Sequence, residues 1–281
     1  MRTEIDPSLL IGLGALEPYL ADIVIVGGWV PHLYALHQGT VRSNPPRTAD
    51  IDIAVPRALP PRGPSIDELL SRAGFECQFR SRDVPPVTAY VARRGDDDVE
   101  IEFITDAPGA EAGVVEVQHG LTAQELHYVR LLLENTWTID LAKLIRSGAR
   151  HEVRVPTPAA FIMHKGLVYR KRTDQLKKEK DLYYIFYVVD TFVEWHDWIR
   201  SDLSTLAARW PAWVKRCAAN LCGAFAASDS AGVQALLNQR PQTAYPGLND
   251  DQFREYAWST MNALEEMMRT ALRASGRGPL R

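Results

Sequence analysis

Two aspartates, Asp50 and Asp52, stand two positions apart in the run R-T-A-D-I-D-I-A-V and are the residues best suited to chemistry. The β-branched residues between and after them predict a strand, in which side chains at i and i+2 share one face. Neighbouring carboxylates repel each other unless a cation lies between them, and such oxygen ligands suit Mg²⁺ or Mn²⁺. A pair of solvated aspartates on an edge strand is the alternative.

Two glycines, Gly27 and Gly28, end a strand-like run of Ile23 to Val26 and precede a helical pattern with Pro31 in its first turn. Glycines at this place can simply permit a tight turn. They can also let a phosphate chain approach the backbone, where a helix N-terminus offers free N–H groups and the positive end of its dipole. Because D-I-D follows, we favour the phosphate interpretation.

A third carboxylate is expected from the run V-E-I-E-F-I-T, which alternates in the way of a half-buried strand. Val99, Ile101 and Phe103 would face the core, and Glu100 and Glu102 would share the other face. Two solvent-facing strand glutamates are the alternative.

A strand ending in two glycines, then a helix, then a strand with Asp-x-Asp resembles the nucleotidyltransferase superfamily of DNA polymerase β. Arg47-Thr48 and the segment V-P-T-P-A-A-F-I-M-H-K-G-L-V-Y-R-K-R resemble its AbiEii-like bacterial branch, which includes toxin-type transferases. The resemblance spans roughly residues 20–195. It implies an α+β fold, with a mixed sheet flanked by helices in residues 1–155 and a helical domain in residues 156–281.

The helical part begins with Thr157 as the cap and Pro158 at the first helical position. Lys165, Tyr169 and Arg172 would then share one helical face. Lys180-Asp181 resembles a catalytic pair of the family, so Asp181 could orient Lys165 or Arg172, act as a base, or form only a structural salt bridge.

The resemblance implies a set of site residues with three roles. The metal ligands are Asp50, Asp52 and Glu102, with Glu100 as second choice for the third. The nucleotide-binding residues are Gly27, Gly28, Arg47, Thr48, Lys165 and Arg172. The catalytic residues are Asp50, Asp52, Glu102, Lys165 and Asp181.

The implied reaction moves a nucleoside monophosphate from an NTP to an acceptor hydroxyl, with Mg²⁺ or Mn²⁺ as cofactor and release of pyrophosphate. The acceptor stays open between tRNA, as for a toxin of a toxin–antitoxin pair, a protein, and a small molecule. Because Gly28 replaces a serine common in related transferases, a catalytically inactive nucleotide- or partner-binding module is the alternative.

The bulk composition narrows the class of protein. The net charge of −3 gives no overall basic field that would favour a nucleic-acid binder. The three cysteines form no C-x-x-C pair, and neither a signal pattern nor an apolar run of about 18 residues is present. We therefore expect a cytoplasmic protein without a membrane segment, whose oligomeric state the sequence leaves open. Five tryptophans of the last third are expected in its core.

Overall fold

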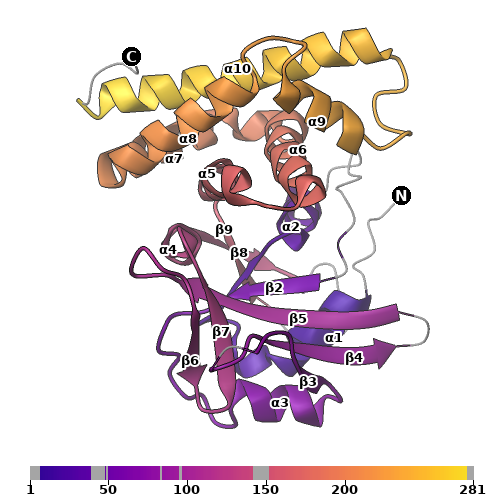
Figure 1. Ribbon diagram of the computed structural model, residues 1–281, viewed down its shortest axis with the longest axis vertical. Coiled ribbons are helices and arrows are strands. Elements are labelled where there is room, and N and C mark those ends of the chain that lie inside the picture. Colours follow the sequence, from indigo (N-terminus) through magenta and orange to yellow (C-terminus); the bar gives the residue numbers. More distant parts are fainter. Residues whose placement is uncertain are drawn as a thin grey trace. The chain divides into compact units, whose positions relative to one another are not determined.

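A computed structural model describes residues 7–38, 48, 50–82, 84–94, 97–141 and 152–276 of the 281-residue chain. These residues fall into two compact units, one ending at Thr157 and the other beginning at Pro158 (Figure 1). Within the described residues, no helix has the length and apolar character needed to cross a membrane.

The first unit combines strands and short helices in the following order. They are α1 (Pro7–Ala15), η1 (Glu17–Tyr19), β1 (Val24–Val26), α2 (Trp29–Gln38), β2 (Asp50–Ala54), α3 (Ile66–Arg72), β3 (Glu76–Phe79), β4 (Thr88–Arg94), β5 (Asp97–Asp106), β6 (Val114–Gln118), β7 (Leu121–Leu126), α4 (Val129–Glu134), β8 (Thr136–Asp140) and β9 (Glu152–Pro156).

The main sheet has the strand order β1-β2-β5-β4-β3, and β7 also pairs with β5 and carries β6 at its other edge. The pairs β2–β5 and β5–β7 are parallel and the others are antiparallel, while β8 and β9 form a separate hairpin-like pair. The expected α+β class with a mixed sheet is therefore confirmed. Because β2 has a partner strand on each side, its expected edge position in the alternative interpretation is wrong, although Asp50 is exposed and lies beyond the residues that pair with β1.

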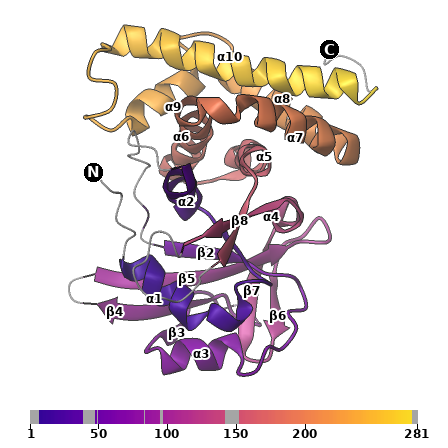
Figure 2. The same ribbon diagram turned by 180° about the vertical axis from the view of Figure 1, so that it is seen from behind.

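Helices α1 and α3 lie together on one side of this sheet (Figure 2). A Cβ placed on Gly12 of α1 would lie 3.0 Å from Cδ1 of Ile51 and 3.2 Å from Cδ1 of Ile101. The helix therefore approaches the sheet closely at Gly12, and the isoleucines of β2 and β5 are fully covered. This side is the apolar face that the alternation of both strands predicts.

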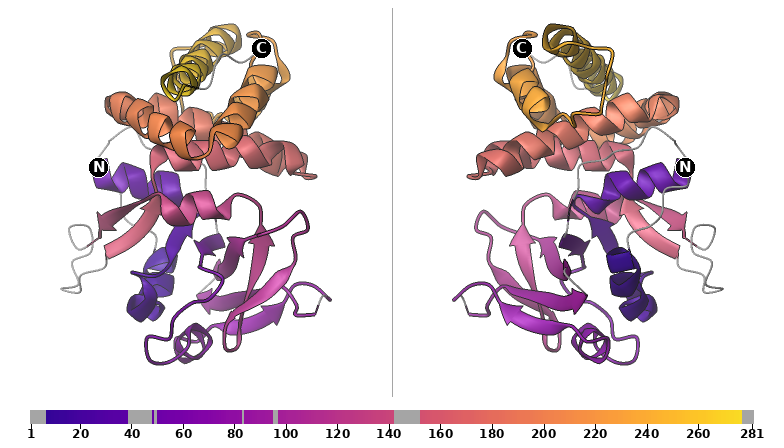
Figure 3. Two further views of the ribbon diagram at one scale, coloured as in Figure 1. Left: turned by 90° about the vertical axis from the view of Figure 1, so that its left-hand side faces the viewer. Right: turned by 90° about the vertical axis from the view of Figure 1, so that its right-hand side faces the viewer.

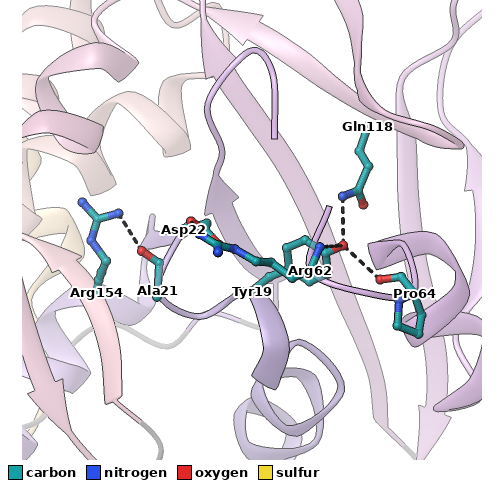
Figure 4. Close-up of polar contacts among 7 residues, drawn as sticks. All are labelled: Tyr19, Ala21, Asp22, Arg62, Pro64, Gln118 and Arg154. Atoms are coloured by element: carbon teal, nitrogen blue, oxygen red, sulfur yellow. Dashed lines mark hydrogen bonds and ion pairs between the residues drawn. The ribbon is translucent and has the colours of Figure 1, made fainter. Parts of the chain in front are cut away.

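The hydroxyl of Tyr19 fixes the end of η1 to the loop before α3 (Figure 4). It donates to the carbonyl of Pro64 at 2.9 Å and accepts from the backbone N–H of Arg62 and from Nε2 of Gln118, both at 3.0 Å. The Arg62 guanidinium also binds the Asp22 carboxylate at 2.7 and 2.8 Å, which holds the pKa of that carboxyl below its ordinary value. These contacts hold the connection into β1 in place.

The second unit is helical, as expected, and is seen from both sides in Figure 3. Its elements are α5 (Pro158–Val168), η2 (Tyr169–Lys171), α6 (Gln175–Thr191), η3 (Val193–Trp195), α7 (His196–Arg209), α8 (Pro211–Ala224), α9 (Ala231–Gln239) and α10 (Asp250–Ala274). Phe186 and Phe253 meet edge to face in its core, with centroids 5.8 Å apart. Asn249 and Gln252 form a capping box at the start of α10, the longest of these helices.

Three local expectations differ from the structure. The sequence near residues 122–134 predicts a short helix, but its first half is β7 and only Val129–Glu134 is helical. The helix carrying Lys165 ends at Val168, so Arg172 follows a 3₁₀ turn in extended backbone and is not on the same helical face. None of the five tryptophans is fully buried, and Trp198 is 36% exposed.

Candidate functional site

The four candidate metal-binding carboxylates lie on two neighbouring parallel strands in matching positions. Asp50 of β2 pairs with Glu100 of β5, and Asp52 pairs with Glu102. Paired residues of adjacent strands point to the same side of a sheet, so all four side chains share one face. Ile51 points to the opposite face, beneath α1. The structure thus brings the two predicted carboxylate pairs together.

The acidic face becomes apolar further along the same strands. Two positions after Asp52, Ala54 joins a buried cluster with Val24, Val26, Ile104, Val129 and Leu132, in which the last two come from α4. Helix α4 therefore covers this end of the face and leaves the acidic end outside the cluster. In agreement, Asp50 is exposed and Asp52 is half-buried.

The carboxylate of Asp52 lies directly against the first glycine of the turn after β1. A Cβ placed on Gly27 would lie only 1.8 Å from Oδ2 of Asp52, and Gly27 has a φ of +69°. Val26, the residue before it, pairs with Asp52 across the antiparallel β1–β2 ladder. Gly27 is thus required both by the backbone conformation and by the space that Asp52 occupies. Helix α2 begins at Trp29, immediately after Gly28.

The two glutamates differ in their surroundings. Oε1 of Glu100 accepts a hydrogen bond from Nη2 of Arg80 at 2.7 Å, so an arginine already partners this carboxylate. Glu102, in register with Asp52, faces Ala89 on the other neighbouring strand. Sequence reasoning gave no sign of Arg80, because it lies after β3 with no motif around it.

The metal-binding capacity of the protein alone is limited. Among the residues that the structure describes, no group of three or more His, Cys, Asp and Glu side chains is placed to hold a metal ion. Mg²⁺ is commonly held by only one or two carboxylates together with substrate phosphates and water. The adjacent Asp50 and Asp52, beside the Gly27 turn, fit that mode of binding, and a closed site made by the protein alone does not.

The predicted nucleotide-binding pair before β2 is only partly described. Arg47 lies outside the described residues. The hydroxyl of Thr48 donates to the backbone carbonyl of Asp50 at 3.5 Å, so its position is local to the start of β2.

The candidate residues of the second unit form a buried ion cluster centred on Asp181. Nζ of Lys165 donates to Oδ1 of Asp181 at 2.6 Å, and Nε of Arg172 donates to Oδ2 at 2.9 Å. The side chains of Lys165 and Asp181 are 8% and 4% exposed, and that of Arg172 is 35% exposed. Asp181 therefore orients both cations, and Lys165 also lies 5.2 Å from the ring centroid of Tyr184.

Electrostatics inside this cluster favour a charged Asp181 and a neutral histidine. Burial alone would raise the pKa of Asp181, but the charges and hydrogen bonds of Lys165 and Arg172 outweigh it and hold that pKa below its ordinary value. Burial, with the charge of Lys165 as the next cause, lowers the pKa of the adjacent His164 to about 3. Nε2 of His164 is buried and has no hydrogen-bond partner in the described part of the chain.

Comparison with known proteins places the chain in a family. A sequence model of a family described as nucleotidyltransferase matches residues 9–204, which is more than half of the chain. The chain belongs to this nucleotidyltransferase family. The matched range includes the glycine turn, the four strand carboxylates, and the Lys165 and Asp181 pair.

Among solved structures, this nucleotidyltransferase is similar to an antigenic nucleotidyltransferase-like protein from Paracoccidioides brasiliensis, at 16% sequence identity and a TM-score of 0.37. The similarity covers 75% of this chain and 91% of that one. No protein with a curated description matches.

Proposed function

We propose that this nucleotidyltransferase moves a nucleoside monophosphate from an NTP to an acceptor hydroxyl in a metal-dependent reaction. The observation that supports the proposal best is the contact of the Asp52 carboxylate with the Gly27 turn, on the face where Glu102 is in register with Asp52. A phosphate-binding site and a cation-binding site would then be adjacent. We also propose that the chain belongs to the AbiEii-like branch of the DNA polymerase β superfamily.

Asp50 and Asp52 are the residues proposed to hold Mg²⁺, or Mn²⁺, with Glu102 as the third carboxylate. When bound, the ion would neutralise phosphate charge and lower the pKa of the acceptor hydroxyl. Gly28 and the N-terminus of α2 would receive the phosphates, because backbone N–H groups there have no partner within the helix. Glu100 is the weaker candidate, because Arg80 already partners it.

Lys165, Arg172 and Asp181 are proposed to act on the phosphates of the same reaction. In this proposal Asp181 is a positioning residue, because it holds both cations by direct hydrogen bonds. A lysine fixed in this way loses little further side-chain freedom when it meets an anion. Its positive charge would then offset the charge that grows on the leaving pyrophosphate.

The acceptor proposed for this activity is tRNA, which the resemblance to toxin-type transferases suggests. Expression of the wild-type chain would then arrest growth, and Lys165→Ala would relieve the arrest. Intact-mass analysis of purified tRNA after incubation with mixed NTPs would show the added nucleotide. An added mass on a small molecule, with tRNA unchanged, would refute this choice of acceptor.

Pyrophosphate release with each NTP and total RNA tests the transfer itself. We expect release with Mg²⁺, none with EDTA, and a loss of more than about 100-fold in Asp52→Asn. Glu76→Gln, a change of an exposed carboxylate on β3, is the matched control and should keep full activity. Equal release by wild type and Asp52→Asn would refute the enzymatic proposal. Tight NTP binding without any release would instead support the inactive binding module.

A further inference from the structure

A pocket lies within the helical unit, and its lining includes none of the residues proposed to act in the reaction. Its volume is about 390 Å³, and its walls come from η2, α6, α8 and α9. This volume falls in the range of about 300–1,000 Å³ that is usual for small-molecule sites. Helices α8 and α9 lie beyond residue 204, where the family match ends. The family match therefore covers the pocket wall from η2 and α6 and does not cover the wall from α8 and α9.

The charge at this pocket is positive. Arg170 and Lys178 both line it, and among the described residues neither forms an ion pair. The contact of Arg170 is a long one, 3.4 Å from Nη1 to Oδ1 of Asn220. Glu179 also lines the pocket. Its carboxylate keeps its negative charge and accepts hydrogen bonds from the side-chain amides of Gln175, Asn238 and Gln239, at 2.9, 3.3 and 3.3 Å. Two cations and one carboxylate therefore border the cavity, and the excess of positive charge favours an anionic ligand.

A glycine at this pocket has no structural reason to be glycine. Gly223 is in the last turn of α8, its φ is not positive, and a Cβ placed on it would meet nothing within 4 Å. Glycine inside a helix costs about 1 kcal/mol relative to alanine. Gly232 on α9 differs, because a Cβ there would lie 2.3 Å from the carbonyl oxygen of Ala224. The open space at Gly223 is thus available to a ligand that approaches the backbone.

The pocket wall near Gly223 is made of small residues and is nearly free of side-chain bulk. Ala224, Ala231, Gly232 and Ala235 line this wall beside Gly223. A flat ring can lie against such a surface, while the cations of η2 and α6 reach a phosphate. We propose that this pocket binds a nucleoside monophosphate unit, either free or as part of an RNA strand.

Titration calorimetry of the full chain in EDTA tests this site directly. The probes are the four ribonucleoside monophosphates, ribose 5-phosphate, inorganic phosphate and a short single-stranded oligoribonucleotide. We expect at least one monophosphate to bind more tightly than ribose 5-phosphate and inorganic phosphate. Tighter binding of the oligoribonucleotide than of the monophosphate identifies RNA as the source, and equal or weaker binding identifies the free nucleotide. Equal affinity for inorganic phosphate and the monophosphates overturns the nucleoside part, and absence of binding at millimolar concentration overturns the whole proposal.

Variants locate the binding in this pocket. Arg170→Gln and Lys178→Gln should each weaken it about tenfold or more, since each removes a charge-assisted hydrogen bond. Gly223→Leu should abolish it by filling the pocket, while a thermal melt shows that the protein is folded. Wild-type affinity in Gly223→Leu would overturn the assignment.

Matched controls separate the pocket from general effects of charge and bulk. Lys215→Gln removes an exposed charge from α8, and Ala212→Leu places the same leucine side chain at an exposed position of that helix. Both should bind as wild type does. Asp52→Asn should also keep this binding, so failure of the proposed transfer reaction and failure of this site are distinguishable.

Discussion

Replacement of Gly27 by alanine tests the contact on which the candidate site depends. Its φ of +69° is unfavourable for any residue with a Cβ, and the added Cβ would lie 1.8 Å from Oδ2 of Asp52. Gly120→Ala is a matched control. Gly120 has a φ of +79°, and its Cβ would lie 3.5 Å from Oδ2 of Asp67, an ordinary contact. The two variants share the backbone cost and differ in the clash.

The expected losses in the free energy of unfolding follow from the backbone conformation and from the clash with Asp52. The left-handed conformation should cost about 1–2 kcal/mol in both variants. The displacement of Asp52 should add about 1–3 kcal/mol in Gly27→Ala alone, as for other forced shifts in packed regions. Urea unfolding followed by circular dichroism measures both free energies. Gly27→Ala should also lose transfer activity, whereas Gly120→Ala should keep it.

A double-mutant cycle with Asp52→Ala identifies the atoms responsible. If the clash is between the new Cβ and the Asp52 carboxylate, Gly27→Ala should cost clearly less in the Asp52→Ala background than in the wild type. The coupling should be about 1 kcal/mol or more. Equal costs in the two backgrounds, or equal costs for Gly27→Ala and Gly120→Ala, would refute the placement of Asp52 against the turn.

Three further predictions concern buried or paired charges. The pKa of His164, about 3 when folded, lies below its ordinary 6.5, so the unfolded state binds the proton first. The free energy of unfolding should therefore fall as pH drops from about 6.5 toward 3, by up to about 1.4 kcal/mol per pH unit. Urea unfolding at pH 7, 6 and 5 measures this fall, which should be smaller in His164→Asn. Lys165→Met should lower the free energy of unfolding by about 3–5 kcal/mol, because Asp181 stays buried with one cation fewer. Adding Asp181→Asn should recover part of that loss in the same urea unfolding assay. In Glu102→Gln, added Mg²⁺ should raise the unfolding temperature less than it does in the wild type. An unchanged Mg²⁺ effect would contradict a role of Glu102 as a ligand.

The sequence predicted the strands of the candidate site well, because their alternation is strong. Ile51 and Ile101 face the core and the acids face the other side, as a period of two requires. The helix start at Pro158 was also predictable, since Thr157 and Pro158 are a local signal. Such features depend on residues close together in the chain.

Features that depend on tertiary contacts could not be predicted in the same way. The parallel pairing that places Asp52 opposite Glu102 joins strands fifty residues apart, and nothing local specifies it. The backbone becomes extended at Arg172, so this residue does not share a helical face with Lys165 as expected. Its side chain still binds Asp181, because α6 brings that aspartate close to it. The salt bridge between Arg80 and Glu100 likewise had no sequence signal.

The arrangement of acids on β2 and β5 is itself an argument for function. Aspartate is a poor strand former, and acids directly opposite each other across a ladder destabilise it. This sheet has two such pairs, Asp50 with Glu100 and Asp52 with Glu102, on a face that is apolar a few residues further on. Arg80 offsets the charge of Glu100. Acids at these positions fit the cation binding that we propose for Asp50 and Asp52 better than a role in the stability of the sheet.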